Sequence, residues 1–159
     1  MDTLDKSIAS ALSEDGRASF SDVGAKLGIT DPTVRSRLNK LIAAEEVKIS
    51  CLVDFSQIRG AVVALLGIRL SGYKLEEKMK QIAKFDEVAW CAVVTGSYDM
   101  MAEVVFTDGI QGLYEFLALK LTKMGGIRST ETFVVMASQN KWILLPSGVK
   151  KQWLNPKSA

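Results

Sequence analysis

The chain has 159 residues, of which 48% are hydrophobic and 24% charged, the balance of a globular protein with a buried core and not of a disordered chain. Its formal net charge of +2 is too small to make the whole molecule a polycation, so any basic surface for nucleic acid must be local. The chain has no histidine and only two cysteines, which excludes the usual zinc sites and the histidine-dependent catalytic systems, and we expect neither metal nor cofactor.

The N-terminal region predicts two short helices in succession. Residues 2–14 have apolar side chains at helical spacing and predict the first helix. A second helix is expected over residues 21–27, with Ser21 as its N-cap. Gly28 follows it, and glycine most readily takes the left-handed conformation that ends a helix.

A third helix is expected to follow Thr30, its N-cap, and to run to about residue 44. Pro32 would lie in its first turn, where the missing N–H of proline costs nothing. One face of this helix is apolar, whereas the other carries basic, amide and hydroxyl groups. The apolar positions are Val34, Leu38, Leu41 and Ile42.

Two short helices joined by a glycine-containing turn, the second of them basic, are typical of a DNA-binding helix-turn-helix. Arginine and asparagine can bind base edges, whereas serine, threonine and lysine bind phosphate oxygens. The alternative is that Arg35, Arg37 and Lys40 form only the solvated face of an amphipathic helix. The turn spacing and the preceding helix favour DNA binding, for which the candidate residues are Ser21, Thr30, Thr33, Arg35, Ser36, Arg37, Asn39 and Lys40.

The segment after the third helix predicts a linker. We place the helical domain at residues 1–46 and the linker at residues 47–60. Alternating apolar residues predict a strand over residues 47–54. Because this strand is apolar, we expect it to pair with a partner chain or with the second domain.

Residues 61–140 predict an α+β domain with the order βαββαβ. This order matches the ferredoxin-like split-βαβ pattern, with both helices on one face of the sheet. The other face is apolar and uncovered, which predicts a dimer. Strands are expected over residues 61–70, 88–95, 100–107 and 127–138, and helices over residues 75–85 and 110–124, the second capped by Asp108.

Residues 141–159 form a basic tail with four lysines and no acidic residue. One interpretation is a partly docked terminal segment with solvated lysines. The other is that residues 142–145 add an edge strand while the lysines make weak phosphate contacts. The residues that set this tail apart are Lys141, Trp142, Lys150, Lys151, Trp153 and Lys157.

An enzyme is the rival class of protein. The best pair of carboxylates is Asp99 and Glu103. Four residues along a strand place them ~13 Å apart, beyond the ~6.5 to 9.5 Å of an inverting glycosidase pair. We therefore expect no catalytic residues.

Three strings of the sequence resemble the Lrp/AsnC (feast/famine) family of transcriptional regulators. The opening LDKSIASALSEDGRASFSDVGAKLGITDPTVRSRLNKLIAAEEV is similar to its N-terminal winged helix-turn-helix, TGSYDMMAEV to the turn of its effector domain, and STETFVVM to its closing strand. Their order and spacing cover nearly the whole chain. One departure is that Glu45, Glu46 and Val47 stand where the family commonly has a glycine before the strand.

The resemblance implies a homodimer formed through the βαββαβ domains, with dimers assembling into tetramers or octamers. It also implies recognition of a palindromic operator in double-stranded DNA and binding of a small effector, typically an amino acid, at interfaces between the domains. An effector zwitterion needs donors for its carboxylate and an acceptor for its ammonium, which these residue types can supply. The candidate effector residues are Gly96, Ser97, Tyr98 and Asp99 in the turn, with Thr130 and Thr132 from a neighbouring subunit.

Two further expectations concern alternatives and location. The alternative function is a stand-alone amino-acid sensor without sequence-specific DNA binding. The apolar run of residues 61–70 is about half of the ~20 residues needed to span a bilayer, and Arg69 interrupts it, so we expect no membrane partner. The N-terminus has no apolar segment typical of a secretory signal, and we expect a cytoplasmic location.

Overall fold

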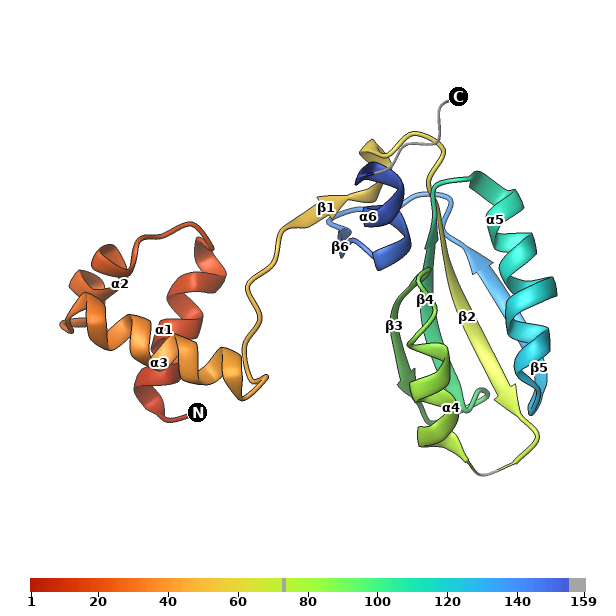
Figure 1. Cartoon of the computed structure of the whole chain (residues 1–159), viewed down its shortest axis with the longest axis horizontal. Helices are drawn as coiled ribbons and strands as arrows, with labels where there is room; N and C mark the ends of the chain where they lie inside the picture. The colour runs from red at the N-terminus through yellow and green to blue at the C-terminus, as the bar shows by residue number, and fades with distance from the viewer. Residues whose placement is uncertain (73, 155–159) are drawn as a thin grey trace. The chain divides into compact units, whose positions relative to one another are not determined.

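The computed structural model describes residues 1–72 and 74–154, and the chain divides into two compact units (Figure 1). The N-terminal unit ends at Cys51 and the C-terminal unit begins at Leu52. Each unit has its own hydrophobic core. Among the described residues, no helix is both long and apolar enough to cross a bilayer.

The N-terminal unit consists of the three predicted helices, α1 (Thr3–Glu14), α2 (Phe20–Leu27) and α3 (Asp31–Ala43). The predicted N-cap of α2 was wrong, because Ser19 and not Ser21 accepts the hydrogen bond from the backbone N–H of Asp22, at 3.0 Å. Phe20 packs on the core as the first helical residue, so the helix begins one residue before the predicted range of 21–27. Ser21 lies exposed in the first turn.

The connection between α2 and α3 is tight. Gly28 ends α2 with φ +68° in the left-handed region, as predicted. Thr30 is the N-cap residue of α3, but its hydroxyl pairs with the Thr33 hydroxyl at 2.9 Å and caps no backbone N–H. Within residues 1–51 the structure has only helices, so no strand of a wing lies in this unit.

The end of α3 shows how the chain tolerates the missing family glycine. Glu45 takes φ +57°, a conformation that favours glycine. The predicted strand over residues 47–54 was too long, since only β1 (Leu52–Asp54) is a strand. Its antiparallel partner β6 (Trp142–Leu144) has three residues and can pair with no more.

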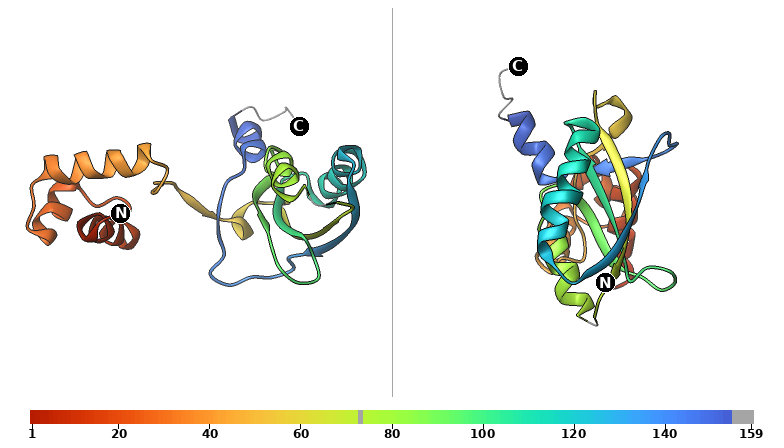
Figure 2. Two further views of the ribbon diagram at one scale, coloured as in Figure 1. Left: turned by 90° about the horizontal axis from the view of Figure 1, so that it is seen from below. Right: turned by 90° about the vertical axis from the view of Figure 1, so that its right-hand side faces the viewer.

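The C-terminal unit has the predicted βαββαβ order, and its four-stranded antiparallel sheet has the strand order β3-β4-β2-β5. Figure 2 shows α4 and α5 on the same side of this sheet. The predicted helix over residues 110–124 consists of α5, a π-helical segment, η2, and a 3₁₀ turn, η3. Asp108 is at the N-cap position of α5, as predicted, but its side chain caps no backbone N–H. The elements are β2 (Val62–Leu70), α4 (Leu75–Ile82), β3 (Val88–Val93), β4 (Met100–Phe106), α5 (Gly109–Glu115), η2 (Phe116–Leu121), η3 (Thr122–Met124) and β5 (Ile127–Val134).

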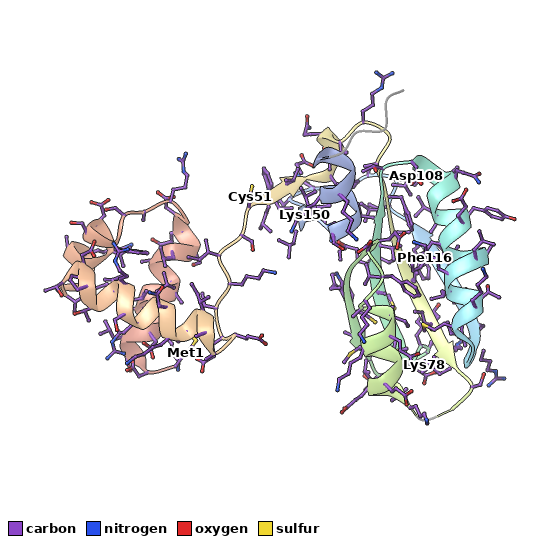
Figure 3. All side chains as sticks on the ribbon, in the orientation of Figure 1. Met1, Cys51, Lys78, Asp108, Phe116 and Lys150 are labelled. Carbon is purple, nitrogen blue, oxygen red and sulfur yellow. The ribbon has the colours of Figure 1, made fainter. Side chains whose placement is uncertain are left out.

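The two faces of the sheet differ in how they are covered. On the helix side, alternate residues of β2 and β4 are buried beneath Phe116, which points from the helix toward the sheet (Figure 3). Phe116 meets Phe85 and Phe106 edge to face, with ring centroids 5.4 and 5.8 Å apart. On the opposite side a second core covers only part of the sheet. It contains Phe55, Val63, Val105, Ile143 and Val149.

The tail folds back on the C-terminal unit through β6 and α6 (Ser147–Leu154). The predicted strand is thus present, in a separate two-stranded sheet with β1. Lys141 forms an ion pair with Glu103, and Lys151 with Asp86, so two of the tail lysines bind carboxylates of the same unit. Lys157 and the side chain of Trp153 lie outside the described residues.

We expect Gly24→Ala to destabilise the N-terminal unit. Gly24 is buried, and a Cβ atom there would lie 2.6 Å from the backbone oxygen of Ile29, so the turn itself must move. The expected loss is about 1 to 3 kcal/mol, as for other overpacked sites, and outweighs the gain in helix propensity of about 1 kcal/mol. Urea unfolding followed by circular dichroism measures it, with Ser21→Ala in the same helix as an exposed control. A Gly24→Ala protein as stable as the wild type would contradict this packing.

Candidate nucleic-acid interface and effector turn

The outward face of α3 is polar. Val34, Leu38 and Leu41 are buried on one side of this helix. Ser36, Asn39 and Lys40 are exposed, and helical spacing places them on the opposite side. The predicted candidates at these three positions therefore form one surface that can contact a duplex.

Arg35 lies on the flank of this surface that faces α2. Its guanidinium is 4.9 Å from the centroid of the Phe20 ring and 3.5 Å from the Asp31 carboxylate. Its side chain is still 60% exposed. Arg35 can thus hold α3 beside α2 and also meet a phosphate or a base.

Arg37 is on the other flank, and the structure corrects its expected orientation. Its Nη1 donates to Oδ2 of Asp2 at 2.6 Å and to Oδ1 of Asp5 at 2.9 Å, so the side chain points to the start of α1 and not along the polar face. The side chain is 34% exposed. Sequence periodicity placed Arg37 off the apolar stripe but could not show the carboxylates beside it.

The start of α1 is itself a closed hydrogen-bonding unit. The Asp2 carboxylate accepts from the Asp5 N–H at 2.8 Å, and the Asp5 carboxylate accepts from the Asp2 N–H at 2.9 Å. The bond from the Asp5 backbone and then the Arg37 guanidinium lower the pKa of Asp2 from 3.8 to about 2. Two acids three residues apart at a helix start are a sequence signal for a capping box, but the signal does not extend to Arg37, which lies 32 and 35 positions away.

In the C-terminal unit, the predicted effector turn lies between β3 and β4. Gly96 has φ +117°, which glycine adopts most readily. The Asp99 carboxylate accepts a hydrogen bond from the backbone N–H of Leu70 at 2.7 Å, and the Asp99 N–H donates to the Ile68 carbonyl at 3.0 Å. Leu70 lies where the pairing of β2 with β5 shifts register, so Asp99 satisfies a backbone donor at an irregular strand end.

Tyr98 crosses the sheet face opposite α4 and α5. Its ring lies over Gly67, where an added Cβ would come within 2.7 Å of it, and its hydroxyl donates to the Glu131 carboxylate. That bond raises the pKa of the Tyr98 phenol. Arg69 lies 5.2 Å from the ring centroid and donates to the Ser97 carbonyl at 2.7 Å. Sequence reasoning missed Gly67, Arg69 and Glu131, although a glycine within a strand often marks a close approach.

Thr130 and Thr132 are on β5, but not beside Tyr98. They pair with Ile68 and Leu66, whose side chains are buried on the helix side of the sheet, so both threonines share that side. Thr130 borders a small pocket beneath the end of η2. One chain therefore does not bring the turn and the two threonines into a single site.

Other groups that could support chemistry are paired or buried. Glu103 is almost fully buried and forms its ion pair with Lys141. Burial raises the pKa of the Cys91 thiol to about 11, which keeps it protonated at neutral pH. Within the described residues, no three Cys, Asp or Glu side chains are grouped as metal ligands.

Both units match models of known protein families. Residues 1–42 match the AsnC-type helix-turn-helix domain, and residues 63–141 match the Lrp/AsnC ligand binding domain. These two matches correspond to the two compact units and confirm the sequence resemblance.

Relatives and solved structures show the same similarity over most of the chain. An uncharacterized HTH-type transcriptional regulator of Pyrococcus horikoshii is 32% identical over 143 residues, covering 89% of each chain. Regulatory protein AsnC of Haemophilus influenzae is 30% identical over 138 residues, covering 86% of this chain and 91% of its own. The structure of E. coli AsnC superposes with a TM-score of 0.71 at 25% identity, covering 92% of this chain and 99% of that one. A Neisseria meningitidis transcriptional regulator in complex with L-Met has a TM-score of 0.72 at 20% identity, covering 91% and 95%. The chain therefore belongs to the Lrp/AsnC family of HTH-type transcriptional regulators, with a helix-turn-helix unit followed by a ligand-binding domain.

Proposed function

We propose that this regulator acts in the cytoplasm by binding a palindromic operator in double-stranded DNA through paired α3 helices. The observation that carries this proposal is the polar surface of α3, which lies opposite a fully buried stripe in a matched helix-turn-helix unit. Asn39 has the amide that can bind adenine bidentately, whereas Lys40 and Ser36 can bind phosphate oxygens. Arg35, Ser21, Thr30 and Thr33 are further candidates.

The pairing of helices requires a dimer, and we place its interface on the open sheet face. The strand registers put Leu65, Trp90, Met101 and Phe133 on this side. Trp90 is 43% and Phe133 44% exposed, so each of the two edge strands, β3 and β5, presents an exposed aromatic ring on this side. A second copy would bury this apolar surface, and a two-fold dimer fits a palindromic site because both have the same symmetry. Further assembly into tetramers or octamers is part of the proposal.

The effector site is proposed at the Gly96–Asp99 turn. One Asp99 oxygen binds the Leu70 N–H, but a carboxylate has about four lone-pair positions and can also accept from an ammonium. Thr130 and Thr132 would come from a neighbouring subunit, since they lie on the opposite side of the sheet from Tyr98. The L-Met complex of the Neisseria regulator supports an amino acid as effector.

We expect effector binding to change DNA affinity through the assembly of subunits. A ligand between subunits changes DNA affinity only by binding one assembly better than another, with a typical coupling of about 1 to 3 kcal/mol. The alternative, an amino-acid sensor without sequence-specific DNA binding, is disfavoured by the match of residues 1–42 to a helix-turn-helix domain and by the polar surface of α3.

We expect Asn39→Ala and Lys40→Ala to weaken DNA binding in different ways. Loss of a base contact at Asn39 should cost about 1 to 3 kcal/mol on the selected duplex and relax specificity at one position. Loss of a phosphate contact at Lys40 should weaken all sequences alike and reduce the salt slope by about 1. Fluorescence anisotropy on a duplex selected from a random library and on random DNA measures both, with Lys84→Ala in the other unit as control. Unchanged affinity of both variants for both duplexes would exclude this surface.

We expect Asp99→Ala and Asp99→Asn to separate the two roles of this carboxylate. The alanine variant loses the bond to Leu70 and should be less stable without ligand by about 1 kcal/mol, whereas asparagine keeps an acceptor. Both variants lack the charge and should lose the thermal shift caused by the best-binding amino acid while retaining DNA binding. Calorimetry with that amino acid provides the check: retained affinity in Asp99→Asn would place the ammonium partner elsewhere.

We expect Trp90→Glu to dissociate the proposed dimer. It would put a negative charge on this sheet face opposite Glu103 of the neighbouring strand, where burial by a second copy is unfavourable. Sedimentation equilibrium should then show monomers. Ile110→Glu, which changes a residue that is 63% exposed on α5, is the control and should leave the dimer intact. A dimeric Trp90→Glu protein with wild-type affinity would place the interface on another surface.

A further inference from the structure

We infer that Arg37 acts as a positioning residue, which fixes the recognition helix against the start of α1, and that it does not contact DNA. This inference rests on the proposed DNA binding by α3. Its basis is the bridge from one Arg37 nitrogen to both Asp2 and Asp5. The bridge joins side chains 32 and 35 positions apart, so it is a tertiary contact between two helices.

The partners of Arg37 are themselves held in place. Asp2 and Asp5 each accept a hydrogen bond from the backbone N–H of the other, which fixes both carboxylates at the first turn of α1. Only 15% of the Asp5 side chain is exposed. Arg37 therefore binds a preformed pair of acceptors and not two mobile surface chains, for which an ion pair would contribute little.

The position of Arg37 around the helix explains what the bridge would control. The apolar stripe of α3 resists separation of the helix from the core, but apolar contacts are not directional and permit some roll about the helix axis. Arg35 contacts Phe20 on one flank, and Arg37 contacts α1 on the other. Two polar contacts on opposite flanks set the roll, and with it the direction in which Asn39 and Lys40 point.

Charge at this position also argues against a DNA contact by Arg37. A phosphate that approached its guanidinium would come close to two carboxylates, well within the Debye length of about 8 Å at physiological ionic strength. Such a phosphate would have to displace charge-assisted bonds of 2.6 and 2.9 Å. Lys40 is an exposed cation on the same helix, and Arg35, 60% exposed, has one carboxylate, Asp31, at 3.5 Å and not two at bonding distance.

The test compares Arg37→Gln with the double variant Asp2→Asn/Asp5→Asn. Asparagine is a good N-cap residue and its one oxygen keeps the capping box, so the two charges and the two oxygens that accept from Arg37 are lost while the cap remains. If Arg37 positions α3, both variants should bind the duplex selected by the wild-type protein about three- to tenfold more weakly, in the range of coupled side chains. Binding to random DNA should change less, and the triple variant should be no weaker than either parent.

If Arg37 instead contacts DNA, the double variant should change DNA affinity in the opposite direction. Removal of two negative charges that restrain Arg37 would then strengthen binding to both duplexes, while Arg37→Gln would weaken both. Glu14→Gln/Asp15→Asn, which removes two carboxylates elsewhere in the same unit, is the matched control for the general effect of charge. A double variant that binds the selected duplex as well as this control or better would overturn the inference.

A second measurement shows whether the bridge exists in solution, independently of DNA. Carbon-detected NMR titration should give Asp2 a pKa of about 2 in the wild type and a higher value in Arg37→Gln, still below 3.8 because the bond from the Asp5 N–H remains. Because the folded-state pKa is lowered, the stabilisation by Asp2 is complete above pH 3.8 and is lost as the pH falls toward 2. An unchanged Asp2 pKa in Arg37→Gln would overturn the inference. A wild-type protein that does not prefer any selected duplex would instead refute the proposed DNA function.

Discussion

One-sided burial is the constraint on which both units depend. Each amphipathic element places one face in the core of its own unit, where apolar area removed from water stabilises it by about 25 cal/mol per Å². In α3 that face holds Val34, Leu38 and Leu41, so its polar residues must point outward. In the sheet, α4 and α5 cover one side. The partly open sheet side opposite α4 and α5 and the outward side of α3 are therefore consequences of the same packing.

The two outward surfaces differ in chemistry and so suit different partners. The surface of α3 is polar and basic, which fits a phosphate backbone and base edges. The open sheet side is apolar around Trp90 and Phe133 and fits a second copy of itself. Within the C-terminal unit, the Gly96–Asp99 turn holds the end of β2 through backbone and carboxylate bonds. A ligand at this turn would act on the sheet that forms the proposed dimer.

Local patterns in the sequence predicted most of the fold because periodicity reflects burial directly. The three helices, the βαββαβ order and the glycine turn at Gly28 follow from apolar spacing and a single backbone preference. Features that depend on tertiary partners were not predictable in this way. The length of β1 is set by β6, the direction of Arg37 by α1, and the place of Tyr98 by a glycine in another strand. The candidate sites were thus located by residue type, whereas their geometry required the structure.

The central claim is that DNA and a small effector are coupled through one protein assembly, and reciprocal linkage tests it most directly. The best-binding amino acid would be titrated calorimetrically into the free protein and into its complex with the selected duplex. The account predicts that the two affinities differ by the same factor by which the amino acid changes DNA affinity, about 5- to 150-fold. Equal amino-acid affinities for the free protein and the complex would show that the two sites are independent and would contradict the account.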